Sequence, residues 1–142
     1  MTIEEKGKYY REKGYNCCQS VLCTLKEYTG LSEELSAALA SGFGGGIQCG
    51  NVCGAVTGSL MAISSTCLPG KDPEAEKPLG VELTKALEAE FEEKAGTLLC
   101  GDITEKYDRD RCDEFILFAA TVAERIIQEQ LKKNEENKEN EA

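Results

Sequence analysis

Residues that begin and end helices divide this sequence into short segments, and within each segment the apolar residues recur at intervals of three or four. Asn16 and Gln19 have the spacing of a capping box, in which each side chain bonds the backbone N–H of the other residue. Gly30 then ends the segment, because glycine readily adopts the left-handed conformation that follows a helix. No segment has the pattern of a β-strand. The sequence therefore predicts an all-α protein.

The same signals recur along the chain. Besides a helix over 16–28, we expect helices over residues 1–13, 32–40, 52–64, 72–95 and 110–131, with a short helical turn from 102. The expected N-caps of the later segments are Ser32, Asn51, Asp72, Asp102 and Asp110. Pro78 and Gly80 predict a break or kink in the helix over 72–95. We expect a single compact domain of about five to six helices over residues 1–132.

Apolar residues mark the helix faces that are expected to turn inward. In the helix over 32–40 these residues are Leu35, Ala38 and Leu39. The last helix carries a wider stripe, formed by Phe115, Ile116, Phe118, Ala119, Val122, Ala123, Ile126 and Ile127. Both helices are therefore predicted to pack against the core.

The helix over 52–64 is rich in small residues, including Gly54 and Gly58. Each glycine disfavours a helix by about 1 kcal/mol relative to alanine, so tight packing against a neighbouring helix must compensate. At the other end of the chain, residues 133–142 have no apolar periodicity. They are expected to form a disordered, polar tail.

Charge excludes several classes of partner. The chain has 26 acidic and 16 basic residues, giving a formal net charge of −10. Phosphate binding needs clustered Lys and Arg, so this balance argues against nucleic acid and against an anionic membrane surface. No stretch reaches the roughly 18 apolar residues of a membrane span, and residues 1–14 lack the apolar core of a secretory signal. We expect a soluble protein of the reducing cytoplasm.

Eight cysteines and the absence of histidine narrow the chemistry. Without histidine, the chain has no Ser–His or Cys–His pair and no imidazole ligand for a metal. Structural disulfides are rare in a reducing cytosol, so metal binding or redox work is the preferred interpretation of the cysteines.

Four of the cysteines lie at or near expected helix starts. Cys17 is the first residue of its helix, Cys53 and Cys112 are second in theirs, and Cys100 lies just before the expected short turn. The first turn of a helix has unpaired N–H groups and the positive end of the dipole, which favour a thiolate and lower the pKa of a thiol. These four cysteines are therefore the candidate catalytic, redox-active residues, and the candidate metal ligands.

The other cysteines give weaker signals. Cys23 and Cys67 are expected to be structural, and Cys18 points about 100° away from the preceding thiol on a helix. Cys49 and Cys53 form a C-x3-C pair, which lacks the C-x2-C spacing of zinc-ribbon and thioredoxin-like sites. A flexible loop would still bring Cys49 to the same site.

A glycine-rich loop precedes the small-residue helix. Gly44, Gly45 and Gly46 are not followed by the Lys-Ser/Thr of a P-loop, and no strand precedes them as in a dinucleotide-binding loop. We interpret them as residues that let the chain wrap closely round the thiol site. Cofactor contacts are accordingly expected from these three glycines together with Cys49 and Gly54.

Basic residues near the last helix are candidates to pair with thiolates. They are Arg109, Arg111 and Arg125. The alternative is ordinary surface pairing with the many carboxylates.

Two segments resemble a known family. Residues 16–21 (NCCQSV) resemble the "NCAQAV" start of the C_GCAxxG_C_C family of redox-active proteins. FGGGI at 43–47, with CGAVTG at 53–58, is similar to its glycine-rich loop and CGAxxG motif. The resemblance covers about residues 7–130 and implies an all-helical domain; a related domain occurs in split-Soret-type cytochromes, for which an iron–sulfur cluster has been proposed. It assigns the family's four cysteines to Cys17, Cys53, Cys100 and Cys112, the last two by position more than by motif.

The leading hypothesis is that these four thiols converge on one site for electron transfer. They would bind an iron–sulfur cluster or zinc or, without a cofactor, work as two dithiol/disulfide pairs. The implied partner is a redox protein or a small thiol or disulfide, and the sequence leaves open whether the protein is an oxidoreductase or an electron carrier. The alternative is a non-catalytic binding module, in which the helix over 52–64 forms a homodimer or partner contact and the cysteines are buried packing.

Overall fold

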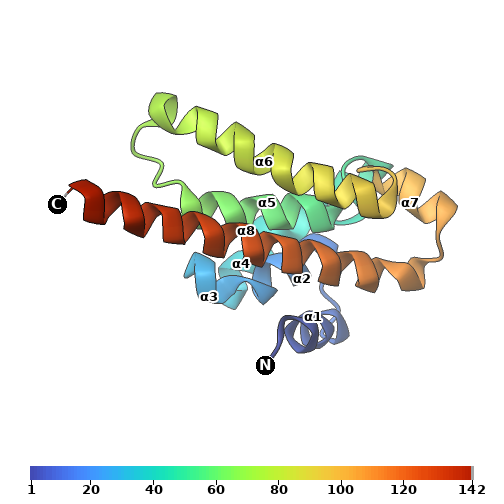
Figure 1. Ribbon diagram of the computed structural model, residues 1–142. Helices are drawn as coiled ribbons and strands as arrows, with labels where there is room; N and C mark the ends of the chain where they lie inside the picture. Colours follow the sequence, from blue (N-terminus) through green and yellow to red (C-terminus); the bar gives the residue numbers. More distant parts are fainter. Residues whose placement is uncertain (142) are drawn as a thin grey trace.

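The computed structural model describes residues 1–141, which are mostly α-helical (Figure 1). No β-strand occurs among these residues, so the predicted all-α class is confirmed. The helices are α1 (Ile3–Glu12), α2 (Cys17–Thr24), α3 (Lys26–Thr29), α4 (Glu33–Ala40), α5 (Gly54–Cys67), α6 (Pro73–Ala95), α7 (Cys100–Lys106) and α8 (Cys112–Glu141). Three short turns join them: η1 (Ser41–Phe43), η2 (Gly46–Gly50) and η3 (Arg109–Arg111). Within the described range, no helix is both long enough and apolar enough to cross a membrane.

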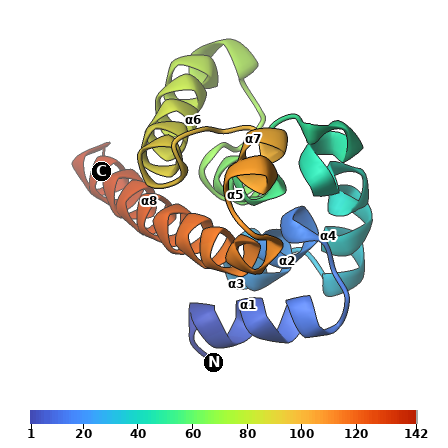
Figure 2. The same ribbon diagram turned by 90° about the vertical axis from the view of Figure 1, so that its right-hand side faces the viewer.

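Helix α5 lies in the middle of the molecule (Figures 1 and 2). Helices α6 and α8 pack against it and against each other, and α2 packs against it from another side. Phe91 of α6 and Phe115 of α8 are both buried, with ring centroids 6.0 Å apart. Helix α1 lies outermost, against α2 and α8. The apolar core therefore surrounds α5.

Several of the predicted helix boundaries are confirmed. Asn16 and Gln19 form the expected capping box, with each side-chain oxygen 2.9 Å from the other residue's backbone nitrogen. Ser32 and Asp72 cap α4 and α6 through their side chains. The helix expected over 16–28 is divided at Leu25, where φ −98° and ψ 13° leave the helical region. This division gives two helices, α2 and α3, in place of one.

Asn51, Asp102 and Asp110 are not N-caps, contrary to expectation. The backbone at Asn51 is extended because its C=O accepts the N–H of Cys100 at 2.7 Å, and α5 begins three residues later. Asp102 lies inside α7, where it accepts a hydrogen bond from the Thr97 hydroxyl, and Asp110 lies in η3. The true starts of α5, α7 and α8 differ by a residue or two from the prediction, and each start falls on a cysteine or directly after one.

The prediction that Leu35, Ala38 and Leu39 face the core is wrong. All three are exposed, the two leucines by 48% and 51%, whereas Ser36 and Ala40 are fully buried. Helix α4 packs against α2 with these small side chains on its inner face. Its leucine periodicity therefore marks the outer face.

Helices α6 and α8 are both longer than the sequence suggests. Helix α6 continues through Pro78 and Gly80 without the expected break, because Pro78 lies in the second turn, where it removes a single backbone bond near the helix start. Helix α8 buries the predicted stripe, with Phe118 half-buried. It then continues to Glu141, although a disordered tail is expected over 133–142. The side chains over 133–140 are mostly exposed, and most of them are Lys or Glu, which are good helix formers; residue 142 lies outside the described part. The boundary between domain and tail stays a prediction.

Helix α5 approaches α2 closely because it carries glycine at the contact. A Cβ on Gly58 would lie 2.7 Å from the carbonyl oxygen of Cys18 and 3.2 Å from the Cβ of Val21. Real Cβ atoms do not tolerate the first of these distances, so only hydrogen fits. The small residues of α5 thus pack within the chain, as the sequence predicts.

Replacing Gly58 by alanine should therefore destabilise the protein by about 1–3 kcal/mol, since the added methyl group forces α2 and α5 apart. Denaturation in urea, followed by circular dichroism, measures this change. Gly80→Ala is the matched control: its Cβ would meet only the Leu68 side chain at 3.4 Å, and alanine favours a helix interior by up to about 1 kcal/mol. A Gly58→Ala protein as stable as the native one would contradict the packing described.

Candidate functional site

Four cysteines occupy the starts of four helices. Cys17 is the first residue of α2, Cys53 is the N-cap of α5, and Cys100 and Cys112 are the first residues of α7 and α8. Figure 2 faces the end of the molecule where α7 and the start of α8 lie. The first three thiols therefore lie at helix N-termini, where N–H groups and the positive end of the dipole favour a thiolate. Cys112 differs, because η3 leads directly into α8 and the N–H of Cys112 bonds the C=O of Arg109.

A short antiparallel contact holds two of these cysteines together. The N–H of Cys53 donates to the C=O of Leu98 at 2.8 Å, and the N–H of Cys100 donates to the C=O of Asn51 at 2.7 Å. Val52 and Leu99 face each other between these bonds. The start of α7 is thereby fastened to the segment that leads into α5.

The Cys17 thiol is the most activated group of the site. The Cys53 thiol donates a hydrogen bond to it, and the backbone N–H groups of Gly45, Cys18 and Gly54 donate as well. Together these donors outweigh the opposing effect of burial and lower the pKa of Cys17 to about 6. Cys17 is therefore a thiolate at neutral pH.

The Cys53 thiol is the protonated member of this pair. Its pKa is raised, first because it donates its proton to Cys17 and then because it is buried. A single backbone N–H, that of Ala55, acts in the other direction. Cys17 receives three such N–H groups, which favour a negative charge on its sulfur over one on the sulfur of Cys53.

The glycines of the site are required because other atoms occupy the space of a side chain. A Cβ on Gly54 would lie 2.3 Å from the sulfur of Cys17, and one on Gly44 would lie 2.7 Å from the Asn16 side chain. A Cβ on Gly46 would lie 2.7 Å from the Cβ of Cys100. The chain thus wraps closely round the thiols, as we interpreted the loop. The assignment of these glycines to cofactor contacts stays a prediction.

A left-handed turn runs through the loop beside Cys17. The φ angles of Gly45, Gly46, Ile47 and Gln48 all lie between 58° and 63°. The turn is closed by the N–H of Asn51, which donates to the C=O of Gly46 at 2.9 Å. Such a conformation costs about 1–2 kcal/mol for each residue that is not glycine. The surrounding contacts therefore hold the loop, and the Gly45 amide with it, against its local preference.

Cys100 and Cys112 are half-buried and complete the group. Burial raises the pKa of both thiols, and the negative charge on Cys17 raises each further. Arg109 opposes this rise at both thiols, and Arg11 opposes it at Cys112. All four cysteines therefore share one electrostatic environment.

Of the three arginines expected to pair with thiolates, only Arg109 acts on them. Arg111 pairs with Glu114 at 2.8 Å, and Arg125 pairs with Glu90. Arg111 and Arg125 therefore form surface ion pairs with carboxylates, which was the alternative to pairing with thiolates. Sequence reasoning missed Arg11, because nothing in the spacing relates α1 to the start of α8.

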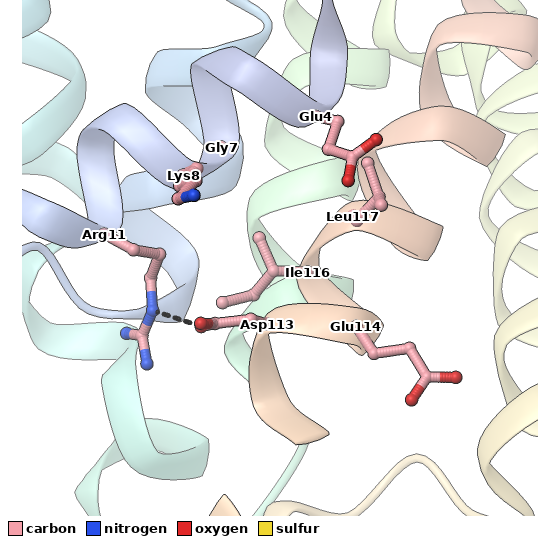
Figure 3. Close-up of a pocket in the computed structure, with 8 residues that line it drawn as sticks. All are labelled: Glu4, Gly7, Lys8, Arg11, Asp113, Glu114, Ile116 and Leu117. Carbon is pink, nitrogen blue, oxygen red and sulfur yellow. Dashed lines mark hydrogen bonds and ion pairs between the residues drawn. The ribbon is translucent and has the colours of Figure 1, made fainter. Parts of the chain in front are cut away.

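Arg11 also ties α1 to the start of α8. Its Nε lies 2.9 Å from the carboxylate of Asp113 (Figure 3). Asp113 is the residue that follows Cys112 in the chain. The two helices enclose a hollow of about 330 Å³, lined by Glu4, Gly7, Lys8, Arg11, Asp113, Glu114, Ile116 and Leu117. No cysteine lines this hollow, and its mixed charges make it a less specific feature than the thiols.

The remaining cysteines fall into two classes. Cys18, Cys23 and Cys67 are buried, and burial raises the pKa of each thiol, to about 11 for the first two. They are inert packing residues. For Cys23 and Cys67 this agrees with the structural role that the sequence predicts. Cys49 is different, because it is exposed, and its thiol points to the C=O of Gly46 at 3.5 Å.

All eight cysteines are free thiols. In the part of the chain that the structure describes, no group of three or more Cys, Asp, Glu or His side chains is arranged to hold a metal ion. The arrangement brings Cys17 and Cys53 into contact and places Cys100 and Cys112 within electrostatic range. The assignment of the four as metal ligands stays a prediction.

The comparisons with known proteins give one match. A family model described as "Putative redox-active protein (C_GCAxxG_C_C)" matches residues 15–126, which is more than half of the chain. This range contains all four helix-start cysteines and the glycines that surround them. No curated protein and no solved structure matches the sequence.

Cys17 should be the cysteine that iodoacetamide modifies fastest at pH 7. Its pKa of about 6 makes it mostly thiolate one unit higher, whereas burial keeps the other site thiols protonated. Gly54→Ala, which displaces the Cys17 sulfur, should slow this modification about tenfold as the pKa returns toward about 8.5. Peptide mass spectrometry of timed samples measures both rates. Gly42→Ala, which adds a methyl group in open space, is the control, and equal rates in all three proteins would refute the assignment.

Proposed function

Because the chain belongs to the C_GCAxxG_C_C family, which confirms the resemblance seen in its sequence, we propose that it is a thiol–disulfide redox protein. In this proposal Cys17 and Cys53 cycle between a dithiol and a disulfide and carry two electrons. The external reactant is the disulfide of a redox partner protein or of a small thiol. The same chemistry serves an oxidoreductase or an electron carrier.

One observation carries the proposal: the Cys17 sulfur lies against the start of α5, where a Cβ on Gly54, the residue after Cys53, would be 2.3 Å from it. At this position the Cys53 thiol and three backbone N–H groups lower the pKa of Cys17. Thiol exchange needs a thiolate to attack and a second thiol nearby to resolve the mixed disulfide. Cys17 supplies the first, because backbone dipoles stabilise its charge. Cys53 supplies the second, because it is protonated and in contact with the first sulfur.

The reaction follows from these two roles. The Cys17 thiolate attacks one sulfur of the incoming disulfide, forming a mixed disulfide and releasing one thiolate, which takes a proton from water. Cys53 then gives up its proton and attacks the Cys17 sulfur. The Cys17–Cys53 disulfide forms, and the second thiolate leaves with that proton. The protein has lost two electrons, and the external disulfide has been reduced to two thiols.

Exposure supports the same order of events. Cys17 is half-buried and accessible, whereas Cys53 is only 8% exposed. Of these two thiols, Cys17 is therefore the one that an incoming disulfide can reach.

A metal-binding role is the second candidate, and one observation favours it. A thiolate at Cys17 raises the pKa of Cys53, Cys100 and Cys112, so a cation or an iron–sulfur cluster among the four would relieve their mutual repulsion. Four cysteine thiolates are the ligand set for such clusters and for structural zinc. The thiols as they lie do not form a metal site, so ligation would require them to rearrange. The dithiol reaction requires no rearrangement beyond the Cys17–Cys53 pair.

The alternative of a passive binding module has less support. It relies on the small-residue helix as a dimer contact, yet the small residues of α5 are buried against α2 within the same chain. It also treats the cysteines as inert packing, which suits Cys18, Cys23 and Cys67 but not the Cys17 thiolate.

The dithiol proposal predicts different products in two single variants. With Cys53→Ser, treatment with oxidised glutathione should leave Cys17 in a mixed disulfide, because the resolving thiol is missing. With Cys17→Ser, Cys53 should stay a free thiol, because it is buried and protonated. Disulfide mapping by mass spectrometry distinguishes these products. A free Cys17 thiol in the Cys53→Ser protein would argue against Cys17 as the attacking group.

The dithiol proposal also predicts that metal removal leaves the reaction intact. Protein purified without oxygen and then treated with a chelator should keep its helical circular dichroism and form the Cys17–Cys53 disulfide at an unchanged rate. Metal analysis with a visible absorption spectrum supplies the counter-test. Stoichiometric zinc, or iron with acid-labile sulfide, that is lost in Cys17→Ser and whose removal abolishes disulfide formation, would favour the metal role instead.

A further inference from the structure

Cys49 is a thiol that the proposed reaction does not use. It is not among the cysteines of the family motif, and it is the exposed member of the eight. It lies in η2, immediately after the left-handed turn that places the Gly45 amide on the Cys17 sulfur. Cys49 is therefore an accessible thiol that lies close in the chain to Cys53 of the proposed redox pair.

Cys49 and Cys100 converge on Gly46. The Cys49 sulfur lies 3.5 Å from the Gly46 carbonyl oxygen. On the same residue, the position of a Cβ would be 2.7 Å from the Cβ of Cys100. Both side chains therefore lie close to Gly46, where a larger residue would collide with the Asn51 backbone and with Cys100.

The chain segments that carry these two cysteines also touch directly. Gly50 follows Cys49, and Gly101 follows Cys100; a Cβ on Gly101 would lie 3.2 Å from the Gly50 carbonyl oxygen, and one on Gly50 would lie 3.4 Å from the Gly101 Cα. Glycine at both positions lets backbone meet backbone. The bond from the Cys100 N–H to the Asn51 C=O, at 2.7 Å, fastens the same two segments together.

Exposure falls in steps from Cys49 to the proposed redox pair. Cys49 is exposed, Cys100 and Cys17 are half-buried, and Cys53 is buried. Cys100 is fastened to the segment of Cys53, and Gly45, the residue before Gly46, donates its N–H to Cys17. Exposure therefore decreases from Cys49 to Cys53, and backbone contacts connect the segments that carry the four cysteines.

We propose that Cys49 and Cys100 form an outer dithiol, which accepts the external disulfide and passes it inward to Cys17 and Cys53. This proposal rests on the redox function proposed above and adds the entry point to it. The external reactant is a disulfide, and Cys49 is the residue that meets it.

The exchange balances at each step. The Cys49 thiol gives up its proton and attacks the external disulfide, which releases one thiolate that takes up a proton in turn. Cys100 gives up its proton, attacks the Cys49 sulfur and expels the second thiol, which leaves a Cys49–Cys100 disulfide. Cys17 then attacks the Cys100 sulfur and frees Cys49. Cys53 gives up its proton, attacks Cys17 and frees Cys100. Two electrons have passed from the Cys17–Cys53 pair to the external disulfide, and the protein now holds a Cys17–Cys53 disulfide.

A trapping experiment tests the outer pair. The double variant Cys17→Ser/Cys53→Ser lacks the inner pair, so oxidised glutathione should leave it with a Cys49–Cys100 disulfide, identified by disulfide mapping. Circular dichroism of the double variant before oxidation establishes that it is folded. If Cys49 and Cys100 both remain free thiols, or if Cys49 carries only glutathione, the outer pair does not exist.

A rate measurement tests its role. Cys49→Ser should form the inner Cys17–Cys53 disulfide at least tenfold more slowly than the native protein when both are mixed with oxidised glutathione. Cys49 is exposed, so this variant leaves the core intact. Cys67→Ala, at the far end of α5, is the control and should react at the native rate. Equal rates for the native and Cys49→Ser proteins would overturn the relay. Absence of the inner disulfide from the native protein itself would overturn the underlying redox function, which is a different result.

Discussion

The close approach of α5 to the start of α2 is the contact on which this site depends. The sulfur of Cys17 occupies the space that a side chain at Gly54 would fill, and the next turn of α5 meets the α2 backbone at Gly58. Glycine at these two positions costs helix propensity, which the burial of the interface offsets. In return, the N-cap of α5 comes into contact with the first residue of α2. The CGAxxG pattern is therefore a packing motif with a chemical consequence, because it places Cys53 on Cys17.

The electrostatics of the site follow from the same geometry. Backbone N–H groups at the starts of α2 and α5 act on the sulfur atoms of Cys17 and Cys53, and the strained loop adds the Gly45 amide at Cys17. These fixed dipoles stabilise one thiolate at Cys17 in a chain whose net charge is −10. A second thiolate beside the first is disfavoured, so the neighbouring thiols keep their protons. The result is a pair with distinct roles, in which one thiol is ionised and its partner retains a proton.

Sequence reasoning predicts this arrangement well where local chemistry decides it. The capping box at Asn16 is a local signal, and it correctly makes Cys17 the first residue of a helix. The prediction of an N-cap at Asn51 is wrong because of a long-range contact: the backbone of Asn51 pairs with the segment at the start of α7. The leucines of α4 mislead for a related reason, since small residues at the contact with α2 decide which face is inside. Arg11 could not be found, because only the fold brings α1 to the start of α8.

The central claim is that Cys17 carries the charge of a thiol pair whose other member stays protonated. The most direct measurement follows the carbon-13 Cβ resonances of both cysteines in the reduced protein by NMR between pH 4 and about 10. The account predicts that Cys17 titrates with a midpoint near pH 6 and that Cys53 does not titrate in this range. Two ordinary titrations near about pH 8.5 would contradict it, because neither the hydrogen bond between the thiols nor the nest of amides would then exist in solution.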